Sequence, residues 1–335
     1  MVYLISLAIA LLAGKGFGMS DKCYTLSMEG GGSHGAYEAG VLWSFATYIP
    51  AEERAWDIIT GISAGSLNAR VCAQFDYGDE INMAENAINA WLSAKTMASI
   101  AVEWPQGLYY STFFEPSLYD SSPMLTFLQQ YSGTVINRNI TVGVTDYESG
   151  EFMEYNQDIG TDLLTVAAKS SASIPFVFTP TLLNGHWYGD GGVLINLNTN
   201  EAISFCRSLG YSDKNIVVDM IRDFDGQDRP KPQIVNNTKE AMDRANVISD
   251  FYSKLWFLYD FSHSFPYVDI RYIAIPTKPL PPWDGTFPLD FKPDDMQWEV
   301  ELGKSDGKSF VENGIKGRHA MKAKKLDEIP ATHYF

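Results

Sequence analysis

Short β-branched runs alternate with longer helical patterns along the chain, and this alternation constrains the fold more than any other feature. Residues 22–28 and 56–60 predict strands, and residues 33–48 and 64–75 predict the helices that follow them. Such alternation is typical of α/β folds, in which helices cover both faces of a parallel sheet. We therefore expect an α/β three-layer sandwich with a mostly parallel central sheet.

The later part of the chain predicts further elements of both kinds. Residues 139–155 predict a hairpin, because two alternating runs flank a turn. Residues 215–221 and 268–275 predict strands, and residues 237–260, which follow two prolines, predict a long helix. No linker separates these elements, so we expect a single domain.

The first residues differ in character from the rest of the chain. The run MVYLISLAIALLA contains no charged side chain. It is too short to span a bilayer of about 30 Å, but its length suits the apolar region of a signal peptide. We predict a cleaved signal over residues 1–18, a folded domain over residues 19–310 and a partly basic tail over residues 311–335. A signal implies secretion or an endomembrane or lysosomal lumen; a buried first strand or helix is the alternative.

The charge balance excludes one class of partner. The 335-residue chain has 41 Asp and Glu against 25 Lys and Arg, a net charge of -16. Proteins that bind nucleic acids neutralise phosphates with basic side chains. We therefore expect no nucleic-acid partner.

The chain contains three cysteines, Cys23, Cys72 and Cys206. No two of them have the C-x-x-C spacing of zinc or redox sites. Three cysteines are also too few for the disulfide framework of a small secreted domain. We expect no bound metal, and a fold that depends on its hydrophobic core rather than on disulfides.

Residues 61–65, GISAG, lie between a predicted strand and a predicted helix. G-x-S-x-G in this context is typical of a nucleophile elbow. Gly61 and Gly65 permit the sharp turn that exposes Ser63, and the start of the following helix stabilises negative charge there. Ser63 is therefore a candidate nucleophile.

Residues 30–35, GGGSHG, also follow a predicted strand and open a helix, and they allow two interpretations. The pattern G-x-G-x-x-G fits a dinucleotide-binding turn, which needs an acidic residue at the end of the next strand. Glu52 and Glu53 stand at about the right distance, but they precede that strand. Alternatively, successive backbone amides of the loop form an oxyanion hole. The second interpretation accounts for both glycine motifs.

A serine nucleophile needs a general base. The chain has five histidines, none in a recognisable catalytic turn: His34, His186, His263, His319 and His333. Residues 188–192, YGDGG, offer Asp190 instead, because the glycines after it let its carboxylate approach another backbone closely. The alternative for this segment is an ordinary tight turn.

Three segments carry these motifs in order along the chain: LSMEGGGSHGAYEAGVL, GISAGSLNA and SSASIPFVFTPTLLNGHWYGDGGVLINLN. Together they resemble the patatin-like phospholipase family. The motif-level similarity runs from about residue 23 to about residue 200, and a weaker likeness extends to residue 310. The resemblance implies a patatin-like α/β fold and no cofactor or metal.

The resemblance also implies an activity, hydrolysis of phospholipid or lysophospholipid acyl esters with release of free fatty acid. Ser63 and Asp190 would form a catalytic dyad with an acyl-serine intermediate, and backbone amides of Gly30, Gly31 and Gly32 would form the oxyanion hole. The supporting motif glycines would be Gly35, Gly61, Gly65, Gly191 and Gly192. Without a histidine, Asp190 must take the Ser63 proton, which favours a buried carboxylate with a raised pKa. The alternatives are a transacylase that uses the same serine and a non-catalytic lipid-binding or storage protein.

The chain departs from the family pattern at His34, where the family usually has Arg or Lys. An unperturbed histidine is charged only below about pH 6.5. His34 is therefore a candidate contact for a substrate anion, and a plain helix-start residue is the alternative. Asn198 stands where the family commonly has proline, with little expected consequence.

Two further segments bear on the lipid substrate. Residues 104–119 are rich in aromatic residues and predict either a lid or a membrane-interface patch, or else ordinary core beneath a loop. Residues 304–325 carry an excess of cations, which would contact anionic headgroups or form a solvated surface. We expect a lipid substrate and peripheral membrane contact.

Overall fold

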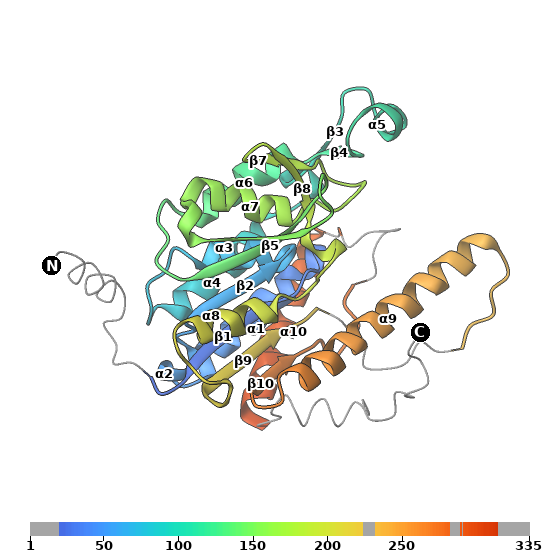
Figure 1. The fold of residues 1–335 in the computed structure, drawn as a ribbon. Coiled ribbons are helices and arrows are strands. Elements are labelled where there is room, and N and C mark those ends of the chain that lie inside the picture. The colour runs from blue at the N-terminus through green and yellow to red at the C-terminus, as the bar shows by residue number, and fades with distance from the viewer. Residues whose placement is uncertain (1–19, 224–231, 282–288, 290, 314–335) are drawn as a thin grey trace.

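The computed structural model describes residues 20–223, 232–281, 289 and 291–313 (Figure 1). The predicted signal over residues 1–18 lies outside these residues, and so does the tail beyond residue 313. Helix α10 (Pro293–Asn313) continues past the predicted domain boundary at residue 310. Among the described helices, none is both long enough and apolar enough to cross a membrane.

The described part of the chain forms a central sheet of eight strands in the order β10-β9-β1-β2-β5-β8-β7, with β6 paired to β5. Strands β10, β9, β1, β2 and β5 run parallel, whereas β6 and β8 are antiparallel to β5 and β7 is antiparallel to β8. The expectation of a mostly parallel sheet is therefore confirmed. The strands are β1 (Cys23–Met28), β2 (Ile58–Ile62), β5 (Ile140–Asp146), β6 (Phe152–Asn156), β7 (Thr181–Leu183), β8 (His186–Asp190), β9 (Ile216–Ile221) and β10 (Asp269–Ala274).

Helices cover both faces of this sheet, which makes three layers (Figure 1). Alternate side chains of a strand point to opposite faces. In β9, Val217 and Ile221 enter the core that includes α1, α3, α4 and α7, whereas Val218 and Met220 enter a second core with α8 and α9. The helices are α1 (Gly35–Tyr48), α2 (Ala51–Arg54), α3 (Ala64–Cys72), α4 (Glu80–Ser93), α5 (Leu108–Phe114), α6 (Ser122–Ser132), α7 (Thr161–Ser171), α8 (Thr199–Ser208), α9 (Thr238–Ser264) and α10.

Glycines bring α10 into close contact with α1. A Cβ atom on Gly40 would lie 2.3 Å from the carbonyl oxygen of Val300, and one on Gly303 would lie 2.2 Å from that of Tyr37. Any larger residue at either position would separate the two helices. This packing fixes α10 beside the glycine-rich loop that begins α1.

A disulfide joins Cys23, at the start of β1, to Cys206 in α8. The expectation that the fold depends on its core rather than on disulfides is therefore wrong in part. The two Cα atoms are 5.9 Å apart although 183 positions separate them in the sequence. Because only the folded topology brings these residues together, their spacing in the sequence carried no signal.

Candidate active site

The glycine-rich loop and the elbow lie side by side at one edge of the sheet. The loop follows β1 and the elbow follows β2, and these parallel neighbours pair Met28 with Gly61 near their carboxyl ends. The carboxyl ends of parallel strands meet at the same edge, where α/β proteins place their sites. Asp190, the last residue of β8, reaches this edge from the antiparallel side, where it pairs with Val144 of β5.

The elbow has the strained turn that its motif predicts. Ser63 has a φ of 50° and a ψ of -119°, a conformation that non-glycine residues rarely adopt. A Cβ on Gly61 would lie 2.2 Å from the carbonyl oxygen of Gly65, so the turn excludes side chains there. The backbone amide of Ser63 donates a hydrogen bond of 2.9 Å to the Ser171 hydroxyl at the end of α7. The glycines and Ser171 together hold Ser63 in this conformation.

Ser63 and Asp190 are in direct contact. The Ser63 hydroxyl donates a hydrogen bond of 2.7 Å to Oδ2 of Asp190, and the amide of Gly192 donates one of 2.7 Å to Oδ1. A Cβ on Gly191 would lie 2.3 Å from the carbonyl oxygen of Gly143, so this glycine permits the close approach to β5. The structure thus brings together the two side chains that the sequence motifs single out.

Burial raises the pKa of Asp190 from an ordinary 3.8 to about 6. The hydrogen bonds from Ser63 and Gly192 favour the ionised form, but they offset only part of this effect. A carboxylate with a raised pKa is a stronger base while it is still ionised at neutral pH. Asp190 is therefore suited to accept the proton of Ser63.

This burial has a cost that can be measured with Asp190→Asn. Because folding raises this pKa, the protonated form of Asp190 stabilises the fold relative to the ionised form. The stabilisation is fully present below about pH 4 and is lost as the pH rises through about 6. The variant should therefore gain stability relative to the parent between pH 4 and pH 8, by up to about 3 kcal/mol. Urea denaturation of both proteins at several pH values tests this.

Asp213→Asn is the control of opposite sign, because the Arg207 guanidinium lowers the pKa of Asp213. As the pH rises through the acidic range, Asp213 of the parent ionises and its carboxylate stabilises the fold. The variant cannot gain this stabilisation, so its stability should fall below that of the parent over this range. A stability difference for Asp190→Asn that does not change with pH would contradict the raised pKa.

The described histidines do not form a triad with Ser63. Nδ1 of His186 lies 3.4 Å from Asp146, and that of His263 lies 2.8 Å from the carbonyl oxygen of Tyr259. Nδ1 of His34 pairs with Glu299, and His319 and His333 lie outside the described residues. The Ser63 hydroxyl instead contacts Asp190 without an intervening imidazole.

Asn196 fixes the start of the glycine-rich loop. Its carbonyl oxygen accepts a hydrogen bond of 3.0 Å from the Gly30 amide, and its side-chain Nδ2 donates one of 2.8 Å to the Gly30 carbonyl oxygen. The prediction that the Gly30 amide belongs to the oxyanion hole is therefore wrong, since that amide is already bonded. Gly32 lines the cavity beside Ser63, which leaves the amides of Gly31 and Gly32 as the candidate donors.

Close packing requires glycine elsewhere in the loop. A Cβ on Gly31 would lie 1.0 Å from Oδ2 of Asp223, and one on Gly35 would lie 2.1 Å from the Trp91 ring. Ahead of the loop, Glu29 forms a buried ion pair with Arg222, with Nε and Oε2 3.1 Å apart. These contacts fix the position of the loop. The glycine motif in the sequence does not indicate the residues that make them, Asp223, Trp91 and Arg222.

The dinucleotide interpretation of this loop is not supported. The position directly after β2, where that interpretation needs an acidic residue, is occupied by Ser63. Glu52 and Glu53 lie in α2, and Glu53 forms an ion pair of 2.8 Å with Arg271. Glu53 is therefore paired away from the loop, with Arg271 of β10.

His34 is buried against α10. Its Nδ1 lies 3.0 Å from Oε1 of Glu299, whose pKa is raised by burial, although the contact with His34 opposes that effect. This pair links the loop to α10, and His34 is not among the residues that line the cavity beside Ser63. These contacts favour a structural role, and the anion contact predicted for His34 stays a prediction.

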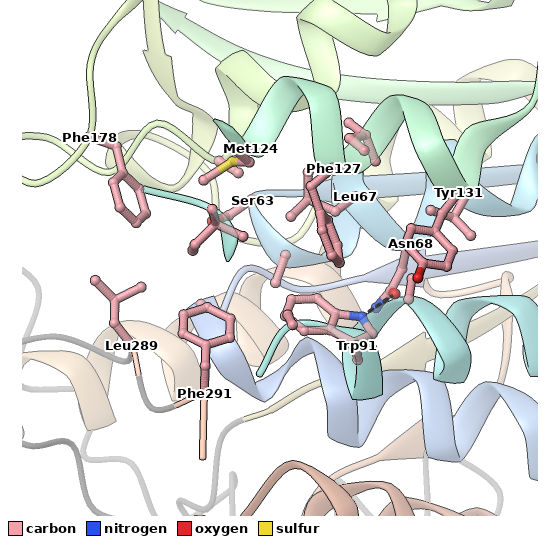
Figure 2. A pocket seen from close by; sticks show the side chains of 18 of the residues that line it. Ser63, Leu67, Asn68, Trp91, Met124, Phe127, Tyr131, Phe178, Leu289 and Phe291 are labelled. Carbon is pink, nitrogen blue, oxygen red and sulfur yellow. Dashed lines mark hydrogen bonds between the residues drawn. The ribbon is translucent and has the colours of Figure 1, made fainter. Parts of the chain in front are cut away.

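An apolar cavity, which with the solvent space at its mouth encloses about 670 Å³, lies beside Ser63 (Figure 2). It follows α3 from Ser63 past Leu67 to Val71, which is roughly 12 Å at the rise of a helix. Figure 2 shows Phe178 and Leu289 on one side of Ser63 and Trp91 and Tyr131 on the other. The larger apolar residues around it include Leu67, Trp91, Met124, Phe127, Phe178 and Phe291. A cavity of this length and polarity can hold a hydrocarbon chain with one end at Ser63.

Comparisons with known proteins agree with the motifs. The sequence model of the family described as patatin-like phospholipase matches residues 26–203, more than half of the chain. Uncharacterized protein R571 of Acanthamoeba polyphaga mimivirus is 26% identical over 175 residues, which cover 51% of this chain and 58% of that protein. The chain thus spans less than two thirds of the length of R571.

Two solved structures show a distant likeness. VipD from Legionella pneumophila has a TM-score of 0.39 and 12% identity, over 88% of this chain and 67% of the VipD chain. The type III effector protein ExoU has a TM-score of 0.31 and 11% identity, over 88% of this chain and 53% of its own. At these TM-scores the likeness adds nothing to the functional argument.

Proposed function

The chain belongs to the patatin-like phospholipase family, and we propose that it hydrolyses lipid acyl esters through an acyl intermediate on Ser63. The observation that carries the proposal is the 2.7 Å hydrogen bond from Ser63 to Asp190 beside an apolar cavity. Phospholipids and lysophospholipids are the proposed substrates, because they combine a long acyl chain with an ester bond.

In the first half of the proposed reaction, the acyl chain occupies the cavity and places its ester carbonyl beside Ser63. Asp190 takes the hydroxyl proton while Oγ of Ser63 attacks the carbonyl carbon. The amides of Gly31 and Gly32 and the start of α3 stabilise the negative charge on the carbonyl oxygen. The carbon–oxygen bond to the lipid alcohol then breaks, and that alcohol takes the proton from Asp190.

In the second half, water hydrolyses the acyl-serine. Asp190 takes a proton from the water molecule as its oxygen attacks the acyl carbon. The bond to Oγ of Ser63 breaks, Ser63 recovers the proton from Asp190, and the free fatty acid leaves. A transacylase would follow the same steps with an alcohol in place of water.

One experiment separates these functions from lipid binding alone. Purified protein is incubated with phosphatidylcholine, with and without an added alcohol acceptor, beside Ser63→Ala. Free fatty acid that the variant does not produce supports hydrolysis, whereas an ester of the added alcohol as the main product supports transfer. Lipid binding without turnover would contradict an enzymatic function.

The cavity predicts a limit on acyl-chain length. Val71 is buried at the far end of the cavity along α3, so Val71→Phe should fill the space that the end of a long chain needs. Excluding three methylene groups costs about 2.4 kcal/mol, or about 50-fold in kcat/KM for long-chain esters. We expect nitrophenyl butyrate to be hydrolysed as before. Val71→Ala is the matched control and should leave long-chain turnover intact; equal losses for short and long chains in Val71→Phe would contradict the placement of the chain.

We also propose that the protein works in an oxidising compartment, outside the cell or in an endomembrane or lysosomal lumen. The predicted signal supports this location, and so does the Cys23–Cys206 disulfide, because disulfides persist mainly in oxidising compartments.

Thiol counting tests the disulfide. The denatured but unreduced protein should expose the thiol of Cys72 and no other, since Cys72 is the buried free cysteine. Reduction of the denatured protein should raise the count to three, because Cys23 and Cys206 are both fully buried in the folded protein. Three reactive thiols without reduction would contradict the disulfide.

A further inference from the structure

The segment over residues 102–120 extends outward from the rest of the molecule (Figure 1). Its ends, β3 (Val102–Glu103) and β4 (Tyr119–Asp120), pair as a short antiparallel stalk, and α5 lies between them. We call this segment the aromatic projection. In the described part of the chain, it is the element that Figure 1 shows farthest from the sheet on the side of β7 and β8.

Large aromatic side chains on α5 face solvent. Tyr109 is 84% exposed, Phe113 is 66% exposed and Phe114 is 69% exposed. The rings pair along the helix, with centroids 5.5 Å apart for Tyr109 and Phe113 and 4.8 Å apart for Tyr110 and Phe114. The alternative that these α5 rings pack in the core is therefore wrong. Contiguous exposed apolar surface of this kind marks a site of interaction.

The stalk is bonded directly to a wall of the cavity. The amide of Leu118 donates a hydrogen bond of 2.8 Å to the carbonyl oxygen of Phe176, and that of Tyr119 donates one of 3.0 Å to Val177. Phe178, the next residue, lines the cavity beside Ser63. Phe176 has a φ of 71° and a largely exposed ring. The base of the projection is thus bonded to the segment that supplies Phe178 to the lining of the cavity.

The charge of the projection selects the kind of surface that it can contact. Residues 102–120 contain Glu103, Glu115 and Asp120 but no lysine or arginine, in a chain with a net charge of -16. Anionic lipids attract basic segments, so they would not attract this one. Aromatic rings bind well where water meets an apolar phase, whatever the charge of the lipid.

Within the described chain, the basic residues near the C-terminus also provide no free positive charge that would attract anionic lipids. Lys304 lies 3.1 Å from Glu301, and Lys308 lies 3.6 Å from Glu312. Both ammonium groups also lie over aromatic rings of α1, Lys304 over Trp43 and Lys308 over Tyr48. The remainder of the basic segment, from residue 314 to residue 325, lies outside the described residues.

We propose that the aromatic projection docks the protein on the surface of a neutral, zwitterionic lipid bilayer. Tyr109, Phe113 and Phe114 enter the interfacial region, and the stalk places the cavity at the membrane surface, where an acyl chain passes from the bilayer to Ser63. The choice of a lipid partner rests on the proposed function.

Vesicle binding tests the proposal in the full chain with Ser63→Ala, which keeps the lipid intact. The test variant adds Phe113→Ser and Phe114→Ser, and the matched control adds Val135→Ser and Leu209→Ser instead. The control side chains are about half exposed, somewhat less than the two phenylalanines, and they lie in the loops that lead into the amino ends of β5 and β9. Flotation with phosphatidylcholine vesicles measures partitioning, and gel filtration measures the oligomeric state.

We expect the parent and the control to bind phosphatidylcholine vesicles equally, and the test variant to bind at least about tenfold more weakly. High salt should not weaken binding, and added phosphatidylglycerol should not strengthen it. Equal binding by both variants, or binding that requires anionic lipid, would overturn the proposal. A change from dimer to monomer with no change in vesicle binding would also overturn it, because the projection would then bind a second copy of the chain.

Nitrophenyl butyrate separates docking from catalysis. In protein that keeps Ser63, the two phenylalanine substitutions should leave the turnover of this soluble ester unchanged and lower the turnover of vesicle lipid. A parent protein that binds vesicles through the projection but hydrolyses neither ester would refute the proposed function and leave docking intact.

Discussion

Ser63→Ala is expected to lower kcat for ester hydrolysis by at least about 10⁴-fold, because the alanine side chain has no oxygen to form the acyl intermediate. The fold should survive, since the glycines and Ser171 that hold the elbow remain in place. Steady-state hydrolysis of a nitrophenyl ester measures the loss, and thermal denaturation checks the fold.

Ser66→Ala is the matched control for this substitution. It removes a buried hydroxyl from the first turn of α3, directly after Ser63. That hydroxyl donates to the carbonyl oxygens of Ser63 and Ala168, and the substitution leaves the nucleophile in place. We expect a stability loss of about 1 kcal/mol and turnover within about tenfold of the parent. A Ser63→Ala protein that keeps more than about a hundredth of the parent activity would refute Ser63 as the nucleophile.

Asp190→Asn is expected to lower kcat/KM by about 10³-fold to 10⁴-fold at pH 8, because an amide cannot take the Ser63 proton. In the parent, only ionised Asp190 acts as a base, and burial raises its pKa to about 6. Activity should therefore be present above about pH 6 and decline as the pH falls through that value. A pH profile of kcat/KM for both proteins measures these effects.

Two outcomes would oppose the role given to Asp190. One is a variant that retains most of the parent activity at pH 8; the other is a parent profile without an ionisation near pH 6. Asp213→Asn, which changes a surface carboxylate paired with Arg207, should keep the parent profile. The same variant thus serves as the control for both activity and stability.

Residues 22–28 and 56–60 predicted β1 and β2 to within two residues, because their signals are local, whereas β8, which carries Asp190, was not predicted. Both runs are rich in apolar or β-branched residues and a glycine motif follows each, so both strand and turn could be located. The order of the strands depends on contacts between distant segments. The antiparallel pairing of β8 with β5, which delivers Asp190 to the site, was therefore not predicted.

Local sequence signals identified some residues of the site, whereas residues held there by contacts between distant segments were missed. Ser63 and Asp190 stand beside glycines whose spacing indicates a sharp turn or a close backbone approach. The structure brings the two side chains into contact. Asn196 bonds to Gly30 across 166 positions of sequence, and Glu299 pairs with His34 across 265. No periodicity or spacing relates residues so far apart.

Covalent labelling of Ser63 is the measurement that tests the proposed mechanism most directly. The purified protein is treated with a fluorophosphonate, digested and mapped by mass spectrometry, beside Ser63→Ala and Asp190→Asn. We predict one modified residue, Ser63, with no labelling of Ser63→Ala and much slower labelling of Asp190→Asn. Modification of another residue, or no modification of folded protein, would contradict a mechanism based on Ser63 and Asp190.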